Sequence, residues 1–233
     1  MGRFSTAEVT AEFLVYWALL FAIFGVVGGV RNETTRAVGA ARSLAAADRS
    51  SRAVTAALLV GGVSALLVAA SAPLWSERLV PSTSPGIIPV VGLAALAYAC
   101  HVTLMGALAG AESWRRFSAL MITESLVRLV LVAAVLLAAG GLMALELAVA
   151  ASALTWLLLL GSSAFRRALA ARTDVPLGTL LRNHLYVIVS SVASSALVVG
   201  FPVLMQLTSP EADAAILAST IFAITLTRSP IMI

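Results

Sequence analysis

Long runs of apolar residues, separated by short polar breaks, recur along the whole chain. Each run approaches the 20 or so residues that a helix needs to cross hydrocarbon about 30 Å thick. The runs are continuous, whereas the strands of a membrane barrel alternate between apolar and polar positions. The pattern predicts an all-α fold, a polytopic transmembrane helical bundle with about seven spans: Ala11–Val30, Ala53–Ala72, Ile87–Gly110, Phe117–Ala139, Leu142–Ser162, Asn183–Leu207 and Ala212–Ile233.

The composition agrees with a membrane location. The chain is 61% hydrophobic and 11% charged, whereas a typical soluble domain is about 25% charged. The sequence contains no Gly-rich phosphate loop, no paired-histidine metal motif and no nucleophile elbow with a candidate base. We therefore expect no enzymatic activity, no catalytic residues, no cofactor and no bound metal.

The charges of the polar breaks predict an orientation. All basic residues are arginines, which together with abundant Ala, Val and Leu indicates a GC-rich bacterial genome. Residues 31–52, 111–116 and 166–182 are net positive, and the breaks between them are neutral or acidic. Positive loops face the cytoplasm, so we place these three there, in a bacterial inner membrane. Ser43 and Thr173 should then be cytoplasmic and Ser82 outside.

Segment 31–52 has two interpretations. Ala37, Val38, Ala41, Leu44 and Ala45 recur at helical spacing between arginines, which is typical of an amphipathic helix lying at the membrane interface. The alternative is a solvated connector.

Both ends of the sequence resemble the ends of a truncated chain. A short N-terminus outside the cell without a signal sequence is unusual, and residues 227–233 stop within an apolar run. We expect a fragment, with one helix missing before Met1.

Three stretches resemble the polysaccharide-transporter and O-antigen flippase branch of the multidrug/oligosaccharidyl-lipid/polysaccharide (MOP) exporter superfamily. They are the span 13–36 with its exit Arg31-Asn32-Glu33-Thr34-Thr35-Arg36, the region 106–128 with Trp114-Arg115-Arg116-Phe117 and Glu124 to Arg128, and Leu226-Thr227-Arg228-Ser229-Pro230. The resemblance implies two lobes of six helices around a central cavity. Residues 1–165 would form the N-terminal lobe without its first helix, 166–182 the cytoplasmic connector, and 183–233 the start of the second lobe.

The resemblance also implies a function. Such a protein would move a lipid-linked oligosaccharide or polysaccharide precursor across the membrane, so its partners would be an anionic diphosphate lipid and membrane lipids, with no nucleic acid. Two alternatives remain open. One is a drug/cation antiporter of the MATE kind, for which intramembrane acidic groups are needed, and the other is a truncated remnant that transports nothing.

Glu124 and Arg128 are the most informative candidates for a substrate site. Four residues apart, they share one helix face and can pair. Arg128 lies eleven residues into its predicted span, about 16 Å deep, where an arginine costs about 2.5–3.5 kcal/mol and should face protein or a wet cavity. Its guanidinium fork suits the oxygens of a diphosphate. The alternative is a buried pair that only fixes helix packing.

The other candidates are weaker. Arg228 lies deep in the last predicted span, before Pro230, which would break the helix there. A further group, Arg31, Glu33 and Arg36, could attract an anionic substrate at a cytoplasmic mouth, although the orientation rule already explains the arginines. His101 could relay protons or simply pack, and a structural role is the preferred interpretation for Glu146, which we place within reach of the outer interface.

Overall fold

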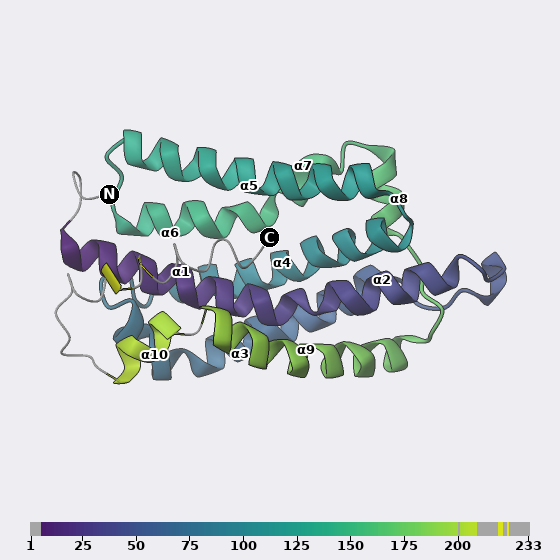
Figure 1. The fold of residues 1–233 in the computed structure, drawn as a ribbon, viewed down its shortest axis with the longest axis horizontal. Coiled ribbons are helices and arrows are strands. Elements are labelled where there is room, and N and C mark those ends of the chain that lie inside the picture. The colour runs from purple at the N-terminus through teal and green to yellow at the C-terminus, as the bar shows by residue number, and fades with distance from the viewer. Residues whose placement is uncertain (1–5, 200, 209–218, 221–222, 224–233) are drawn as a thin grey trace.

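A computed structural model describes residues 6–199, 201–208, 219–220 and 223. The regular elements in this part of the chain are helices, which run side by side along one long axis (Figure 1). They are α1 (Ala7–Gly28), α2 (Val30–Ala41), α3 (Ala53–Leu79), α4 (Ile87–Gly110), α5 (Trp114–Leu137), α6 (Leu142–Ala151), α7 (Trp156–Leu159), α8 (Ser163–Leu169), α9 (Leu177–Val199) and α10 (Phe201–Thr208), with 3-10 turns at Ala46–Asp48 and Ser152–Leu154.

Five helices in the described part are long and apolar enough to cross a membrane: Ala7–Ala41, Ala53–Leu79, Ile87–Gly110, Trp114–Leu137 and Leu142–Leu159. Their outward surfaces are apolar too. On α3, Leu66 and Leu67 are 71% and 64% exposed, and on α5 Leu129 and Val130 are 65% and 62% exposed. Soluble monomers rarely expose large continuous apolar patches, and lipid accounts for such faces. The protein is a multi-pass membrane protein.

Most of the predicted spans correspond to helices, with shifted boundaries. The second span continues through Pro73 to Leu79, seven residues beyond the predicted end. The predicted span Asn183–Leu207 corresponds to α9 and α10, with α9 beginning earlier, at Leu177. The predicted span Ala212–Ile233 lies outside the described residues apart from 219, 220 and 223. The structure therefore confirms a helical, multi-span fold, and the total of seven stays a prediction.

Segment 31–52 differs from both interpretations of its sequence. Gly29 keeps a helical backbone, with φ −54° and ψ −31°, so α2 continues α1 in one run of 35 residues. At 1.5 Å per residue this run is about 50 Å long and exceeds the hydrocarbon core. Ala37, Val38 and Ala41 are buried inside the bundle. The small apolar stripe of α2 thus packs against protein, and the connector begins only at Arg42.

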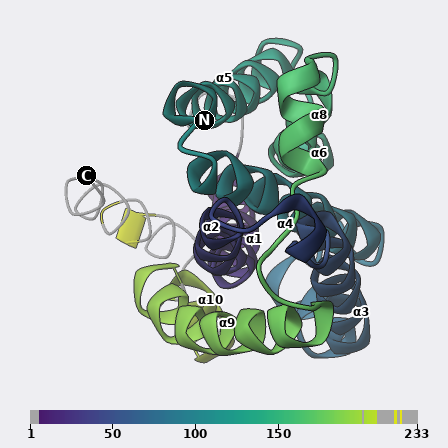
Figure 2. The same ribbon diagram turned by 90° about the vertical axis from the view of Figure 1, so that its right-hand side faces the viewer.

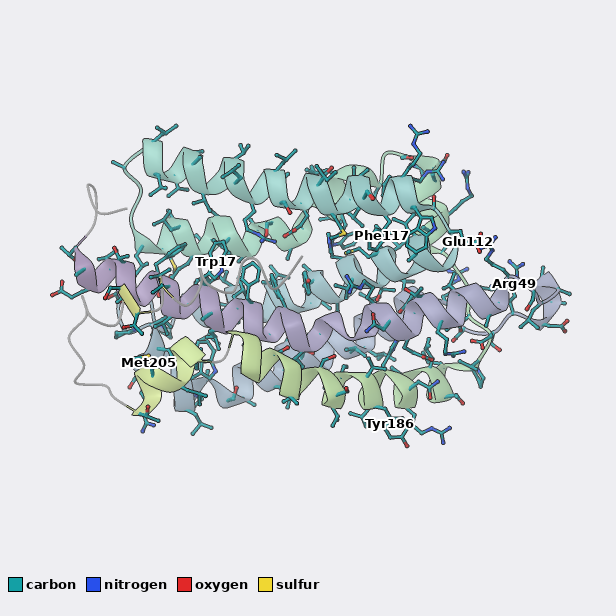
Figure 3. All side chains as sticks on the ribbon, viewed as in Figure 1. Trp17, Arg49, Glu112, Phe117, Tyr186 and Met205 are labelled. Carbon is teal, nitrogen blue, oxygen red and sulfur yellow. The ribbon has the colours of Figure 1, made fainter. Side chains whose placement is uncertain are left out.

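The arginine-rich breaks gather at one end of the bundle, where Arg49 and Glu112 lie (Figure 3). We call residues 42–52, 111–116 and 160–176 the basic end, and residues 80–86 and 138–141 the opposite end. At the basic end, Arg42 pairs with Glu112 over 2.8 Å. The backbone N–H of Ser50 donates to Thr173 O over 2.8 Å, and that of Thr173 donates to Ser51 O over 2.9 Å. The net positive breaks and the neutral or acidic breaks, which alternate along the sequence, therefore lie at opposite ends of the bundle.

Two glycine pairs let helices approach closely. An ideal Cβ on Gly106 would lie 2.7 Å from Arg31 O, and one on Gly110 would lie 2.7 Å from Thr35 O. Both glycines belong to α4, and both backbone oxygens belong to α2. The second pair, Gly25 and Gly29, lies against α9, where the nearest atoms are the hydroxyl oxygens of Ser195 and Ser191. The run α1–α2 is consequently held at the centre of the bundle, between α4 and α9 (Figure 2).

Candidate functional site

Glu124 and Arg128 form an ion pair on α5, as their spacing predicts. Arg128 is the fifteenth residue of α5, about 21 Å from its start and about 14 Å from its end. The Nε of Arg128 also donates to Ser152 Oγ over 3.2 Å, and Ser152 Oγ donates to Glu124 Oε1 over 3.2 Å. The two charged side chains are only 18% and 11% exposed. We call these three residues the intramembrane triad.

Ser152 reaches the pair because the helix changes there. The run 142–159 is α-helical to Ala151, becomes 3-10 over Ser152–Leu154 and resumes as α7. A short 3-10 stretch inside a helix often marks a functional or strained position. The single hydroxyl proton of Ser152 has two acceptors within reach, Val149 O at 2.8 Å and Glu124 Oε1 at 3.2 Å, so the hydroxyl is shared between the helix backbone and the triad. Sequence reasoning missed Ser152, since a serine among alanines carries no distinguishing pattern.

An aromatic surface borders the triad. The Arg128 guanidinium lies over the ring of Phe21, 4.7 Å from its centroid, which is the geometry of a cation–π contact. Phe24 stacks on Tyr98 with centroids 4.0 Å apart, and Tyr98 stacks on His101 at 5.7 Å. The charge of Arg128 is close enough to act on Tyr98 and His101. The structure thus brings three predicted residues, Glu124, Arg128 and His101, into one region.

His101 is buried and packs against an aromatic ring. It is 2% exposed and stacks on Tyr98, and its Nδ1 has no hydrogen-bonding partner among the described residues. A proton relay needs a chain of hydrogen-bonded groups, which the described surroundings of Nδ1 do not supply. Its role as a relay stays a prediction, and the geometry favours packing.

Glu33 and Arg36 form a separate cluster on α2. Arg36 binds both oxygens of Glu33 over 2.8 Å, and its Nη1 donates to Asp174 Oδ2 over 2.9 Å. Asn183 Nδ2 on α9 donates to Glu33 Oε1 over 2.8 Å. Two carboxylates against one guanidinium leave this cluster with a net negative charge. The geometry therefore favours a tie between α2, the 173–176 segment and α9 over a site that attracts anions.

The two remaining predicted arginines lie apart from both groups. Arg31 forms no ion pair with a described residue, and its charge is close enough to act on Tyr98. Arg36, in contrast, donates to Asp174. Arg228 lies outside the described residues.

Known proteins resemble the chain in sequence. "Uncharacterized protein Rv1510" of Mycobacterium tuberculosis strain H37Rv is 34% identical over 223 residues, which are 95% of this chain and 51% of that protein. "Uncharacterized protein Rv3630" of the same strain and "Uncharacterized protein Mb3654" of Mycobacterium bovis are each 34% identical over 228 residues, 95% of this chain and 52% of each of those proteins. The chain spans about half the length of these relatives. No protein-family model matches the sequence, and no solved structure matches it.

Proposed function

We propose that the protein takes part in export across the bacterial inner membrane, moving a lipid-linked saccharide whose diphosphate meets Arg128. The basic end would face the cytoplasm. Two lines support the proposal. The sequence patterns around residues 13–36, 106–128 and 226–230 resemble polysaccharide flippases of the MOP superfamily, and an arginine that is not fully buried lies near the middle of an apolar helix.

The position of Arg128 is the observation that carries the proposal. An arginine at such depth costs about 2.5–3.5 kcal/mol on insertion scales, so a bundle that needed only a helix contact would gain by using apolar residues. A guanidinium has five N–H donors. In the described part of the chain, hydrogen bonds engage its Nε and Nη2 and leave Nη1 without an acceptor. A phosphate oxygen is a suitable partner for that edge.

The antiporter alternative has less support at this site. A drug cation needs an acidic group whose charge is not already balanced, and Glu124 is paired with Arg128. The triad as a whole is neutral and presents a guanidinium edge. It therefore suits an anion better than a cation.

Arg128→Lys tests the proposal in cells whose only copy of the gene carries the change. Lysine keeps the positive charge and can keep the pair with Glu124, but it lacks the planar fork that binds two oxygens at once. We expect normal protein abundance in the membrane together with a loss of surface-polysaccharide export of at least tenfold. Export is measured by labelling surface polysaccharide, and abundance by immunoblotting of membranes.

Arg115→Lys is the matched control, because Arg115 is exposed at the basic end and should tolerate lysine. Normal export by the Arg128→Lys protein would exclude diphosphate binding by Arg128. Reduced abundance of that protein would instead assign the arginine to packing.

A further inference from the structure

Among the acidic side chains in the described part of the chain, Glu146 alone is buried with both carboxyl oxygens lacking a hydrogen-bonding partner. It lies on the second turn of α6 and is 0% exposed, so the prediction that it reaches the interface is wrong. Neither carboxyl oxygen has a hydrogen-bonding partner among the described residues. Its backbone oxygen, in contrast, accepts a bond of 3.0 Å from the hydroxyl of Tyr16. The carboxyl group is therefore buried without the contacts that normally stabilise its charge.

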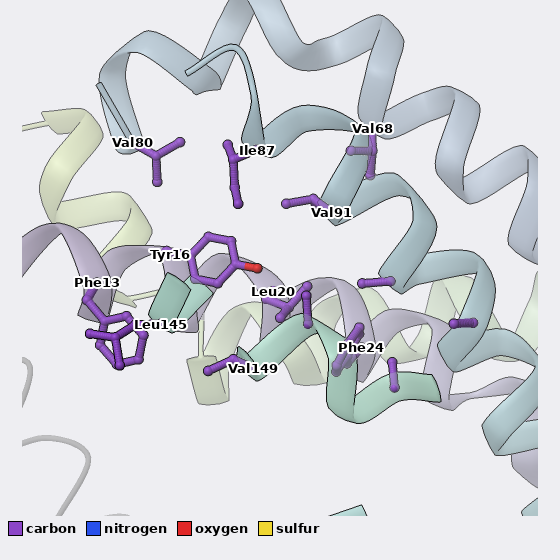
Figure 4. Packing of buried hydrophobic residues seen from close by; sticks show 14 residues of the cluster. Phe13, Tyr16, Leu20, Phe24, Val68, Val80, Ile87, Val91, Leu145 and Val149 are labelled. Carbon is purple, nitrogen blue, oxygen red and sulfur yellow. The ribbon is translucent and has the colours of Figure 1, made fainter. Parts of the chain in front are cut away.

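The surroundings of Glu146 are apolar. Its neighbours Leu145 and Val149 pack with Tyr16 and Leu20 of α1 in one core cluster (Figure 4). This cluster lies near the opposite end of the bundle, where Val80 and Ile87 flank the loop between α3 and α4. The carboxyl group therefore lies beside an apolar core.

Two polar groups act on the carboxyl. The hydroxyl of Thr83, in the loop between α3 and α4, is buried and close enough to act on the Glu146 carboxyl, although the two groups form no hydrogen bond of normal geometry. Glu12 of α1 adds a second negative charge. Its carboxylate accepts bonds from Ser82 N over 2.8 Å and Ser82 Oγ over 2.7 Å, which fastens the same loop over this region. No described basic residue pairs with Glu146.

We propose that Glu146 and Thr83 form a proton-binding site at the opposite end of the bundle. A buried carboxylate without a cation is strongly disfavoured, and the charge of Glu12 disfavours it further. A proton taken from water on that side converts the carboxylate into a neutral carboxyl, whose new O–H donates to Thr83 Oγ1. One proton thus removes the buried charge and gives a partner to one carboxyl oxygen and to Thr83 Oγ1. Release returns the proton to water on the same side.

A proton fits the site better than a metal cation. Hard cations such as Ca²⁺ and Mg²⁺ gather about six or more oxygen ligands, whereas the described chain supplies the carboxyl group, the Thr83 hydroxyl and the Tyr16 hydroxyl. Use of this site to drive export rests on the proposed function. Proton binding itself does not depend on it.

Carbodiimide labelling of the purified full chain tests the proposal without a transport assay. Dicyclohexylcarbodiimide reacts with protonated carboxyls in apolar surroundings, and mass spectrometry locates the modified residue. We expect Glu146 to be labelled, with labelling that rises as pH is lowered and is unchanged by Na⁺. Glu124 is an internal control that should stay unlabelled, because its carboxylate is engaged by the Arg128 guanidinium. Thr83→Ala should shift the pH dependence of labelling at Glu146.

Infrared difference spectra between alkaline and acidic buffer provide a second measurement. The wild-type chain should show the band of a buried protonated carboxyl, and Glu146→Gln should lose it. If Na⁺ reduces the labelling of Glu146, the site binds a sodium ion rather than a proton, and the proposal is overturned. Labelling independent of pH, or the absence of both the label and the band, would also overturn it.

Discussion

Replacing Glu124 by alanine is expected to destabilise the protein by about 3–5 kcal/mol, because it leaves the buried Arg128 without its counter-charge. Ser152 would remain as a partner, since Arg128 Nε donates to its hydroxyl over 3.2 Å, but a hydroxyl carries no negative charge. The effect is measured as a lower midpoint of thermal unfolding in detergent and a lower yield of folded protein.

A double variant separates the charge effect from the loss of side-chain volume. If Arg128 is unpaired in Glu124→Ala, then adding Arg128→Met should recover much of the lost stability, because no buried charge remains. The double variant should therefore unfold at a higher temperature than the single one. If the double variant instead loses as much stability as the two single variants together, the two charged side chains contribute independently, contrary to the geometry of the pair.

The exchange Gly106→Ala is expected to destabilise the bundle by about 1–3 kcal/mol through overpacking. Intrinsic helix propensity alone would make the alanine variant more stable, by about 1 kcal/mol. The expected loss of stability is therefore opposite to what propensity predicts. The new methyl would lie 2.7 Å from both Arg31 O and Thr34 Cβ. A backbone oxygen cannot move aside as a flexible side-chain end can, and α4 would have to separate from α2.

Gly62→Ala is the matched control, since Gly62 is also helical and an ideal Cβ there meets nothing within 4 Å. This variant should be neutral or slightly stabilised. Thermal unfolding of the two variants in the same detergent gives the comparison. If Gly106→Ala is as stable as Gly62→Ala, the close approach of α2 and α4 is not required for the fold.

The spans and the Glu124–Arg128 pair could be predicted because both depend on local spacing. Apolar runs of about 20 residues identify membrane helices, and residues four apart on one helix face each other. The continuation of α1 through Gly29 could not be predicted, because glycine and the polar residues after it usually end a membrane helix. Packing against α4 and α9 keeps that segment helical.

The rest of the site depends on contacts between distant parts of the chain. Phe21 and Ser152 reach Arg128 from positions 107 and 24 residues away in sequence, and neither has a local signal. Glu146 lies near the end of an apolar run, where a carboxylate usually reaches water. Only the packing of α1 and of the loop between α3 and α4 around it shows that it is buried.

Sidedness of the two ends can be measured by cysteine labelling in intact cells, and the proposed direction of export depends on it. Thr173 is fully buried and bonded to Ser51, so it is a poor labelling position. Ser43 at the basic end and Ala138 at the opposite end are exposed. Each is changed to cysteine in a Cys100→Ala background and treated with a membrane-impermeant maleimide.

We expect the cysteine at position 138 to be labelled in intact cells and the cysteine at position 43 only after the membrane is opened. This result would place the basic end in the cytoplasm and the opposite end, with Glu146, on the outer side. Labelling of position 43 in intact cells, with position 138 protected until the membrane is opened, would contradict the orientation. Labelling of both positions in intact cells would contradict the membrane-spanning arrangement itself.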